Sequence, residues 1–324
     1  MKEAVPKVSV SMLAHNVVKF IADAIESVLH QTRDFEIELV IGEDCSDDNT
    51  REICDAYAAK YPDVIRVLPS DINRGIAGNT ARLWQHCRGE YIAICDSDDL
   101  WIDPRKLKTQ VEFLDQHPGC GAVYTDVEVI SETGETLDPE VYHHVRSRYA
   151  SGKVFSHLLQ GNFINNSTAI FRRSLIQDYR IDEDKSYYSY DYLFWLHIAS
   201  QSEIHFWNAK TTKYRKHSGG VTSSDKRLPR NRQKYLQYLP FLLLKFDRRR
   251  PWRLTSEEKA RIFRKNLSVI YRREADVRTK LRILQIMPRY FPGVRGIVNM
   301  LSAKYGKSKR RSASPDSAKS GTNK

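Results

Sequence analysis

An apolar run in this sequence ends abruptly in three carboxylates. The run Tyr91–Cys95 reads YIAIC, and Asp96, Asp98 and Asp99 follow it within four residues. Carboxylates held this close repel one another unless a positive charge joins them. Oxygen ligands prefer hard cations such as Mg2+ or Mn2+, which are usually bound by one or two carboxylates together with substrate phosphates. The segment therefore predicts a metal-assisted phosphate site or, as the alternative, an acidic turn that caps the next helix.

Strands and helices are expected to alternate along the first 100 residues. Hydrophobic spacing predicts strands at 8–13, 35–42, 64–68 and 91–95. It predicts helices at 19–31 and 77–87, and a further helix that follows the second strand and ends at 61. This alternation is typical of βαβ units in a mostly parallel sheet. The loops 14–16, 43–44 and 96–99 each follow a strand, and ligands of open α/β sheets bind beyond the carboxyl ends of strands. The three loops are therefore expected to share one site.

The second half is predicted to mix helices, strands and one long loop. A helix is expected at 107–117, a strand at 121–130 and a polar hairpin turn at 131–135. The aromatic and basic segment 138–150 is interpreted as a mobile loop. Further on, the pattern favours a short helix at 154–159, a strand at 167–171 and a helix at 191–200.

Composition and charge restrict the class of protein. The chain has 324 residues, 41% hydrophobic content and a net charge of +12, and its basic residues are dense from Lys226 onward. Five cysteines without a CxxC pair argue against a disulfide framework or a structural zinc site, and fit a reducing compartment. The N-terminal residues lack the apolar region of a signal peptide, and no run approaches the ~20 apolar residues of a membrane span.

Five segments, in order, resemble family 2 glycosyltransferases of the GT-A fold. They are VSVSMLAHN, IGEDCSDDNT, NRGIAGNTARLW, GEYIAICDSDDLW and YSYDYLFWLHIA. The likeness covers about residues 5–222. It implies a GT-A catalytic domain at 1–225, with a nucleotide-sugar-binding half at 1–103 and an acceptor half at 104–225. We expect a helical basic extension at 226–305 and a disordered tail at 306–324.

The resemblance implies a donor site at the strand ends. Asp98 would bind a divalent metal (Mn2+ or Mg2+) on the donor diphosphate, with Asp96 near the ribose and Ser97 between them. Asp44, with Glu43 beside it, would recognise a uracil- or thymine-type base. The resemblance also implies that a short loop, Ala14, His15 and Asn16, packs over the base and that Arg74 lies near the donor.

The resemblance places the acid–base chemistry in the second half. Asp191 would be the general base that deprotonates the acceptor hydroxyl, although Tyr190 stands where the family usually has an acidic residue. His217 would contact the metal or diphosphate. The supporting residues implied are Asp99 behind the loop, Trp195 as an acceptor wall or a core residue, and Arg215, in a segment expected after the last strand.

The implied function is metal-dependent, inverting transfer of a sugar from a UDP- or dTDP-linked donor. The acceptor would be a glycan or lipid-linked hydroxyl in surface-polysaccharide or lipopolysaccharide synthesis, and the protein is expected in the cytoplasm. The basic C-terminal region either contacts an anionic membrane or packs on the catalytic domain. A nucleotidyltransferase is one alternative, but a Gly-rich phosphate loop is missing near the N-terminus. A non-enzymatic protein that binds anionic polymers is another, although acidic strand ends would repel nucleic acid, so no nucleic-acid partner is expected.

Overall fold

The computed structural model describes residues 5–159, 161–181 and 190–220, with five further residues between 277 and 285. The chain divides into two compact units, Met1–Leu228 and Pro229–Lys324, and the sheet lies in the first. Apart from those five residues, the predicted basic extension and tail lie outside the described residues. None of the described helices is long and apolar enough to cross a membrane.

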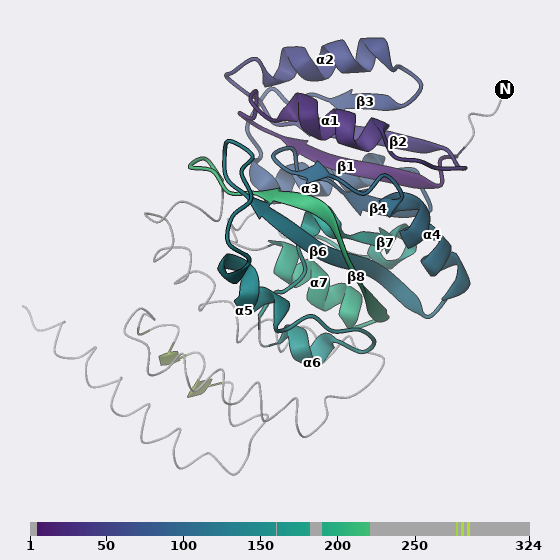
Figure 1. Ribbon diagram of the computed structural model, residues 1–324, viewed down its shortest axis with the longest axis vertical. Helices are drawn as coiled ribbons and strands as arrows, with labels where there is room; N and C mark the ends of the chain where they lie inside the picture. The colour runs from purple at the N-terminus through teal and green to yellow at the C-terminus, as the bar shows by residue number, and fades with distance from the viewer. Residues whose placement is uncertain are drawn as a thin grey trace, which may run out of the picture. The chain divides into compact units, whose positions relative to one another are not determined.

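One eight-stranded sheet organises the first unit, in the order β3-β2-β1-β4-β7-β6-β8-β5 (Figure 1). The strands are β1 Val8–Ala14, β2 Ile37–Glu43, β3 Ile65–Leu68, β4 Tyr91–Ile94, β5 Leu100–Trp101, β6 Cys120–Ile130, β7 Ile170–Arg172 and β8 Glu203–Arg215. Strands β3, β2, β1 and β4 pair in parallel, as β6 and β8 do, whereas β7 is antiparallel to both β4 and β6. The predicted α/β class with a mostly parallel sheet is confirmed.

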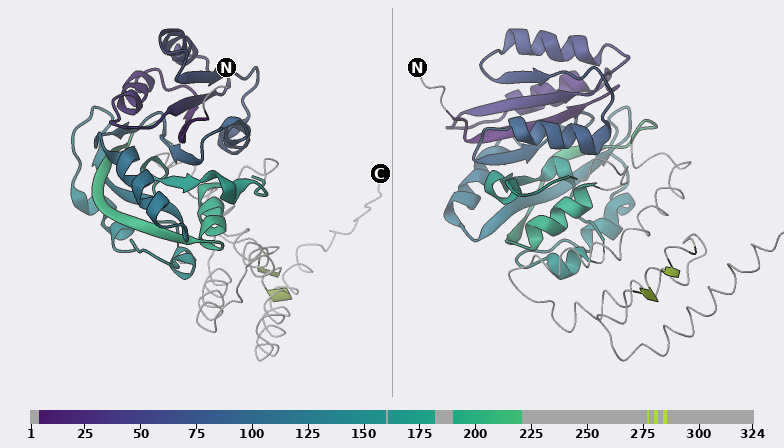
Figure 2. Two further views of the ribbon diagram at one scale, coloured as in Figure 1. Left: turned by 90° about the vertical axis from the view of Figure 1, so that its right-hand side faces the viewer. Right: turned by 180° about the vertical axis from the view of Figure 1, so that it is seen from behind.

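Helices cover both faces of this sheet (Figure 2). The longer ones are α1 Ile21–Leu29, α2 Thr50–Lys60, α3 Gly75–His86, α4 Lys106–Gln116 and α7 Tyr190–Ala199. Short helices connect the later strands: η1 Pro139–Tyr142, α5 His143–Arg146, α6 Phe155–Leu158, η2 Asn166–Thr168 and η3 Arg173–Ile176. The helices predicted in the first half all form, with boundaries that differ by a few residues.

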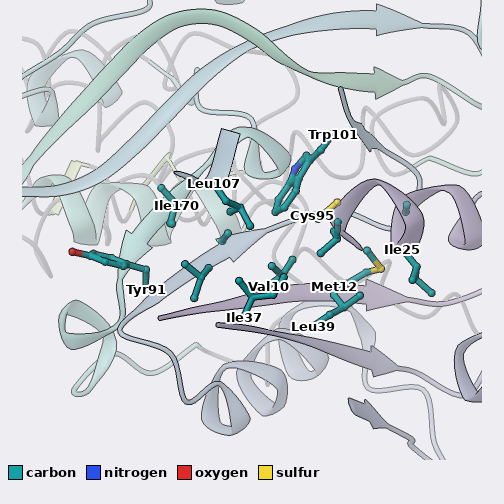
Figure 3. Packing of buried hydrophobic residues seen from close by; sticks show 14 of the residues in the cluster. Val10, Met12, Ile25, Ile37, Leu39, Tyr91, Cys95, Trp101, Leu107 and Ile170 are labelled. Atoms are coloured by element: carbon teal, nitrogen blue, oxygen red, sulfur yellow. The ribbon is translucent and has the colours of Figure 1, made fainter. Parts of the chain in front are cut away.

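Alternating side chains of the strands build a separate core on each face. Val10 and Met12 of β1 point to one face, where they share a buried cluster with Ile25 of α1, Leu107 of α4 and Trp101 (Figure 3). On the other face, Trp84 of α3 lies 5.4 Å from Phe171 of β7 and 4.6 Å from Phe194 of α7, measured between ring centroids. Period-two alternation on the strands thus fixes which helix covers which face.

Part of the predicted mobile loop at 138–150 is instead helical, because residues 139–146 form η1 and α5. The cause is a pairing distant in sequence: Arg146 Nε lies 3.0 and 2.9 Å from the two carboxylate oxygens of Asp126 on β6. Tyr149 also donates from its hydroxyl to Asp126, at 3.0 Å. The two contacts of the charged pair and the one from Tyr149 together anchor the segment to the sheet.

Two further element predictions need correction. The strand expected at 167–171 begins only at Ile170, because the Asn165 side chain accepts a bond from the Ser167 amide (3.0 Å) and turns the chain into η2. Arg215, expected beyond the last strand, is the last residue of the 13-residue β8. Strand β8 pairs with β6 through register shifts, and this irregular pairing hides it from a simple alternation pattern.

A lysine is buried in the core directly behind the strand ends. Lys106 is 0% exposed, and its Nζ donates to Gln110 Oε1 at 2.9 Å and lies 4.2 Å from the centroid of the Trp101 ring. Burial lowers the pKa of Lys106 to about 7. An unfolded lysine titrates near 10.4, so the unfolded chain binds more protons than the folded one between these pH values, and stability rises across that window.

We expect Lys106→Met to be more stable than the parent chain near pH 7, by about 1–4 kcal/mol, because a charge is no longer buried. The difference should shrink as the pH rises from 7 towards the pKa of about 10.4 of an unfolded lysine, above which the parent lysine is neutral in both states. Urea unfolding at pH 7 and pH 9 measures this, with Lys108→Met on the same helix as the control. A difference that stays constant with pH would contradict titration of Lys106 in this window.

Candidate active site

The parallel strands β2, β1 and β4 bring three predicted loops to one edge of the sheet. Ala14, the last residue of β1, lies opposite Glu43 at the end of β2, and Ser11 lies opposite Ile94 at the end of β4. The chain therefore leaves all three strands at the same edge. The 14–16, 43–44 and 96–99 loops meet there, as the alternation of strands and helices predicted.

The two acidic residues at the end of β2 are both buried but point to different partners. Glu43 is 1% exposed, and its carboxylate accepts from the Ser46 amide at 2.8 Å. Asp44 is 3% exposed, and its Oδ1 accepts from the backbone N–H of Arg74 at 2.9 Å. The Arg74 side chain donates to Ser70 Oγ at 3.2 Å. Asp44 thus fixes the 73–75 turn beside the site, whereas Glu43 supports the loop that leads into α2.

Two residues beyond the ends of β1 and β2 adopt left-handed backbone conformations. Asn16 has a φ of 54° and Cys45 a φ of 59°. The two loops are joined by hydrogen bonds from the Asn16 amide to Ser46 Oγ (3.2 Å) and from the Asp47 amide to Asn16 Oδ1 (3.0 Å). His15 is exposed, and its Nε2 lies 3.0 Å from Asn73 Nδ2. The 14–16 loop therefore reaches across to the turn that Asp44 holds.

The carboxylates after β4 lie in a tight turn with distinct environments. The Asp96 amide donates to Ser167 Oγ at 3.0 Å, and the Asp99 amide donates to the Asp96 carbonyl at 3.0 Å. Ser97 between them is buried. Burial and the charge of Asp98 raise the pKa of Asp96 to about 7. A cation beside Asp98 would lower the pKa of Asp96 again and keep the carboxylates of Asp96 and Asp98 ionised.

Asp99 faces away from its neighbours, into the protein. It is 1% exposed, and its Oδ1 accepts from the Arg215 amide at 2.9 Å, while its Oδ2 is buried without a hydrogen-bond partner among the described residues. Burial, followed by the charges of Asp98 and Asp96, raises the pKa of Asp99 well above its usual range, which favours the neutral carboxyl. The contact ties the turn to the end of β8.

The end of β8 supplies two basic side chains to the same turn. Arg215 is 7% exposed, and it donates from Nε to the Asp98 carbonyl (3.1 Å) and from Nη1 to the Glu132 carbonyl (2.9 Å). His217 Nε2 lies 3.0 Å from Asp98 Oδ2. Phe20 packs against both, with centroid distances of 4.7 Å to the Arg215 guanidinium and 4.9 Å to the His217 ring. Arg215 therefore supports the backbone of the turn, and His217 meets its central carboxylate.

The pair formed by Asp98 and His217 consists of two side-chain types that can bind a divalent cation. Across the described ranges, no group of three or more His, Cys, Asp or Glu side chains is placed to hold a metal. Asp98 Oδ2 and His217 Nε2 form a hydrogen bond of 3.0 Å, and a carboxylate oxygen with an imidazole nitrogen is a set of ligands that divalent metals accept. Two protein ligands leave positions open for phosphate oxygens, as is usual for Mg2+.

The residues predicted in the second half lie on α7. Asp191 is half-buried, and its Oδ2 accepts from Asn162 Nδ2 at 2.8 Å. Its negative charge contributes to the raised pKa of Asp96, so the two carboxylates lie within electrostatic reach of each other. Trp195 is 0% exposed and donates from Nε1 to Asn166 Oδ1 at 3.0 Å. The structure therefore places Trp195 in the core, which is one of the two interpretations that the sequence left open.

Comparison with known proteins decides the family. The model of Glycosyl transferase family 2 matches residues 9–180, more than half of the chain. The chain belongs to this family.

Two relatives illustrate the range of similarity to this family 2 protein. The uncharacterized protein Mb1547 of Mycobacterium bovis is 32% identical over 216 residues, which cover 67% of this chain and 60% of the relative. A putative teichuronic acid biosynthesis glycosyltransferase, TuaG of Bacillus subtilis, is 33% identical over 137 residues, covering 42% of this chain and 53% of that protein. This chain therefore spans less than two thirds of the length of either relative.

Solved structures establish that the fold is shared with GT-A glycosyltransferases. TarS of S. aureus in complex with UDP-GlcNAc superposes with a TM-score of 0.65 at 17% identity, covering 94% of this chain and 92% of TarS. The mannosyltransferase PcManGT of Pyrobaculum calidifontis, solved with GDP-Man and Mn2+, gives a TM-score of 0.58 at 17% identity over 95% of this chain and 81% of its own. The predicted GT-A fold of this family 2 protein is confirmed.

Two residues near the site were not predicted from the family 2 motifs. Ser167 holds the Asp96 amide, and Asn162 holds the Asp191 carboxylate. Both belong to the stretch GNFINNST at 161–168, whose density of asparagines before a strand was the available signal. Their partners are 71 and 29 residues away in sequence, so only the folded chain identifies them.

Proposed function

We propose that this family 2 protein is a metal-dependent, inverting glycosyltransferase that uses a UDP- or dTDP-linked sugar. The observation that carries the proposal is the pairing of Asp98 with His217, 3.0 Å apart. Asp191 lies close enough that its charge, like that of Asp98, raises the pKa of Asp96. One segment could thus meet the diphosphate while another meets the acceptor. The family match favours sugar transfer over the nucleotidyltransferase and polymer-binding alternatives.

Each half of the site has a distinct part in the proposed reaction. Asp44, with the 14–16 loop, would recognise the base, and Asp96 the ribose. A divalent cation held by Asp98 and His217 would neutralise charge on the leaving diphosphate. Asp191 would take the proton of the acceptor hydroxyl as that oxygen bonds to the anomeric carbon. The bond from this carbon to the diphosphate breaks, and its electron pair leaves with the diphosphate.

The acceptor and the location are proposed from the chemistry and the relatives. The name of the B. subtilis relative refers to teichuronic acid biosynthesis, which supports a glycan or lipid-linked acceptor in surface-polysaccharide synthesis. We propose that the enzyme works in the cytoplasm, at the inner face of the membrane. The basic region that would contact anionic lipid lies outside the described residues.

A nucleotide-binding screen tests the proposal. UDP, dTDP, GDP and CMP are titrated into the full chain by calorimetry, each with and without Mn2+. We expect UDP or dTDP to bind, more tightly when Mn2+ is present, because a cation held by Asp98 and His217 would supply positive charge beside the diphosphate. Absence of binding by all four nucleotides to the folded protein would overturn the donor site.

A further inference from the structure

An amide side chain donates a hydrogen bond to the carboxylate of Asp191. Asn162 Nδ2 donates to Asp191 Oδ2 at 2.8 Å, and the side-chain oxygen Oδ1 of Asn162 accepts from the backbone N–H of Ile164 at 3.1 Å. The second bond determines which end of the amide faces α7, because the carbonyl is already engaged with its own loop. The N–H of Asn162 is therefore directed at the carboxylate.

The segment that carries Asn162 is fixed at its other end to the turn after β4. Ser167 Oγ accepts from the Asp96 amide, and the Ser167 carbonyl accepts from the indole N–H of Trp101 at 2.6 Å. Between these ends, Asn166 accepts from the indole of Trp195 on α7. Residues 162–167 thus form a short bridge between the helix that carries Asp191 and the loop that carries Asp96.

We propose that Asn162 is a positioning residue for Asp191, and that the 162–167 bridge sets the place of this carboxylate relative to the donor loop. The inference rests on the proposed role of Asp191 as general base. A hydrogen bond from a neutral amide orients the carboxylate and favours its charged form. Asn162 therefore keeps the Asp191 carboxylate ionised and correctly oriented, without itself contacting the substrates.

Removal of the amide should change both the rate and the titration of the base. A small misplacement of a catalytic group can lower a rate by about 10²-fold, so Asn162→Ala is expected to slow transfer by about 10- to 100-fold. The pKa of the Asp191 carboxyl should rise, because its charged form loses a donor. In Asn162→Asp it should rise further, because a second negative charge of similar shape is added.

The deciding experiment is a carboxyl-carbon NMR titration of the full chain, with the Asp191 signal assigned by its loss in Asp191→Asn. Wild type, Asn162→Ala, Asn162→Asp and the control Asn208→Ala are compared. Asn208 is an exposed amide on β8. We expect the pKa of Asp191 to increase in the order wild type, Ala, Asp, and to be unchanged in the control.

The same titration in wild type and Asn162→Ala would overturn the inference, even if the variant were less stable, since a purely structural asparagine would affect unfolding alone. Should Asn162→Ala fail to fold, the near-isosteric Asn162→Asp decides in its place. UDP binding with Mn2+ is measured on the same samples. Failure of wild type to bind nucleotides would reject the proposed function, whereas the carboxyl titration, which uses protein alone, would still report on the contact with Asn162.

Discussion

Replacing Asp191 by asparagine is expected to lower sugar transfer by about 10²–10⁴-fold while nucleotide binding stays intact. The amide has nearly the same shape as the carboxylate and can still accept a bond from Asn162, but it cannot take a proton from the acceptor hydroxyl. Asp191 lies on α7, a segment separate from the turn of Asp96 to Asp99. Loss of the base should therefore spare the donor site.

Initial transfer rates and calorimetric titration with UDP or dTDP, on the same preparation, measure the two effects. Asp178→Asn is the matched control, because Asp178 is an exposed aspartate outside the site. Its rate should equal that of wild type. Near-normal transfer by Asp191→Asn would show that another group accepts the proton, and would remove Asp191 from the proposed mechanism.

The second large effect is expected for Asp98→Ala, which should abolish the gain in nucleotide affinity that Mn2+ provides, a loss of about 100-fold or more. Binding without metal should change little, because the base contacts proposed for Asp44 would remain. Calorimetry with and without Mn2+ measures the difference. Asp63→Ala, which removes an exposed carboxylate elsewhere, should leave the effect of the metal intact.

The stability of Asp98→Ala separates loss of a ligand from loss of fold. The charge of Asp98 raises the pKa of both Asp96 and Asp99, so its removal relieves repulsion within the turn. The same change removes the 3.0 Å contact with His217, so the two effects should largely offset each other. Without metal, the variant should therefore unfold within a few degrees of wild type. An unchanged response to Mn2+ in this variant would place the metal elsewhere.

The strand ends of the donor half could be predicted because their signals are local. Each of β1, β2 and β4 is a short apolar run, and each stops where polar residues begin, so topology alone places Ala14, Glu43 and Asp96 at one edge. No long-range information was needed. The basic residues that contact this edge are Arg215 and His217. The family resemblance suggested both, but the hydrophobic pattern of the sequence could not position them.

The second half was harder to predict because its structure depends on contacts between distant residues. The ion pair between Arg146 and Asp126 orders a segment whose composition is typical of a loop. Strand β8 reads EIHFWNAKTTKYR, and its burial does not alternate regularly. The role inferred for Asn162 depends on a partner 29 residues away. The propensities of neighbouring residues do not predict contacts between residues that are distant in sequence.

The left-handed backbone at Asn16 and Cys45 has a consequence for the entropy of ligand binding. The two residues lie in neighbouring loops that hydrogen bonds join through Ser46 and Asp47, so the loops that would flank the proposed base have their shape before any ligand arrives. Ordering flexible chain on association is a main reason why large contact areas yield modest affinity. A base that enters between these loops would meet walls already in place, so relatively few contacts could hold it. Selectivity among bases would then follow from fit to a fixed shape rather than from closure around the ligand.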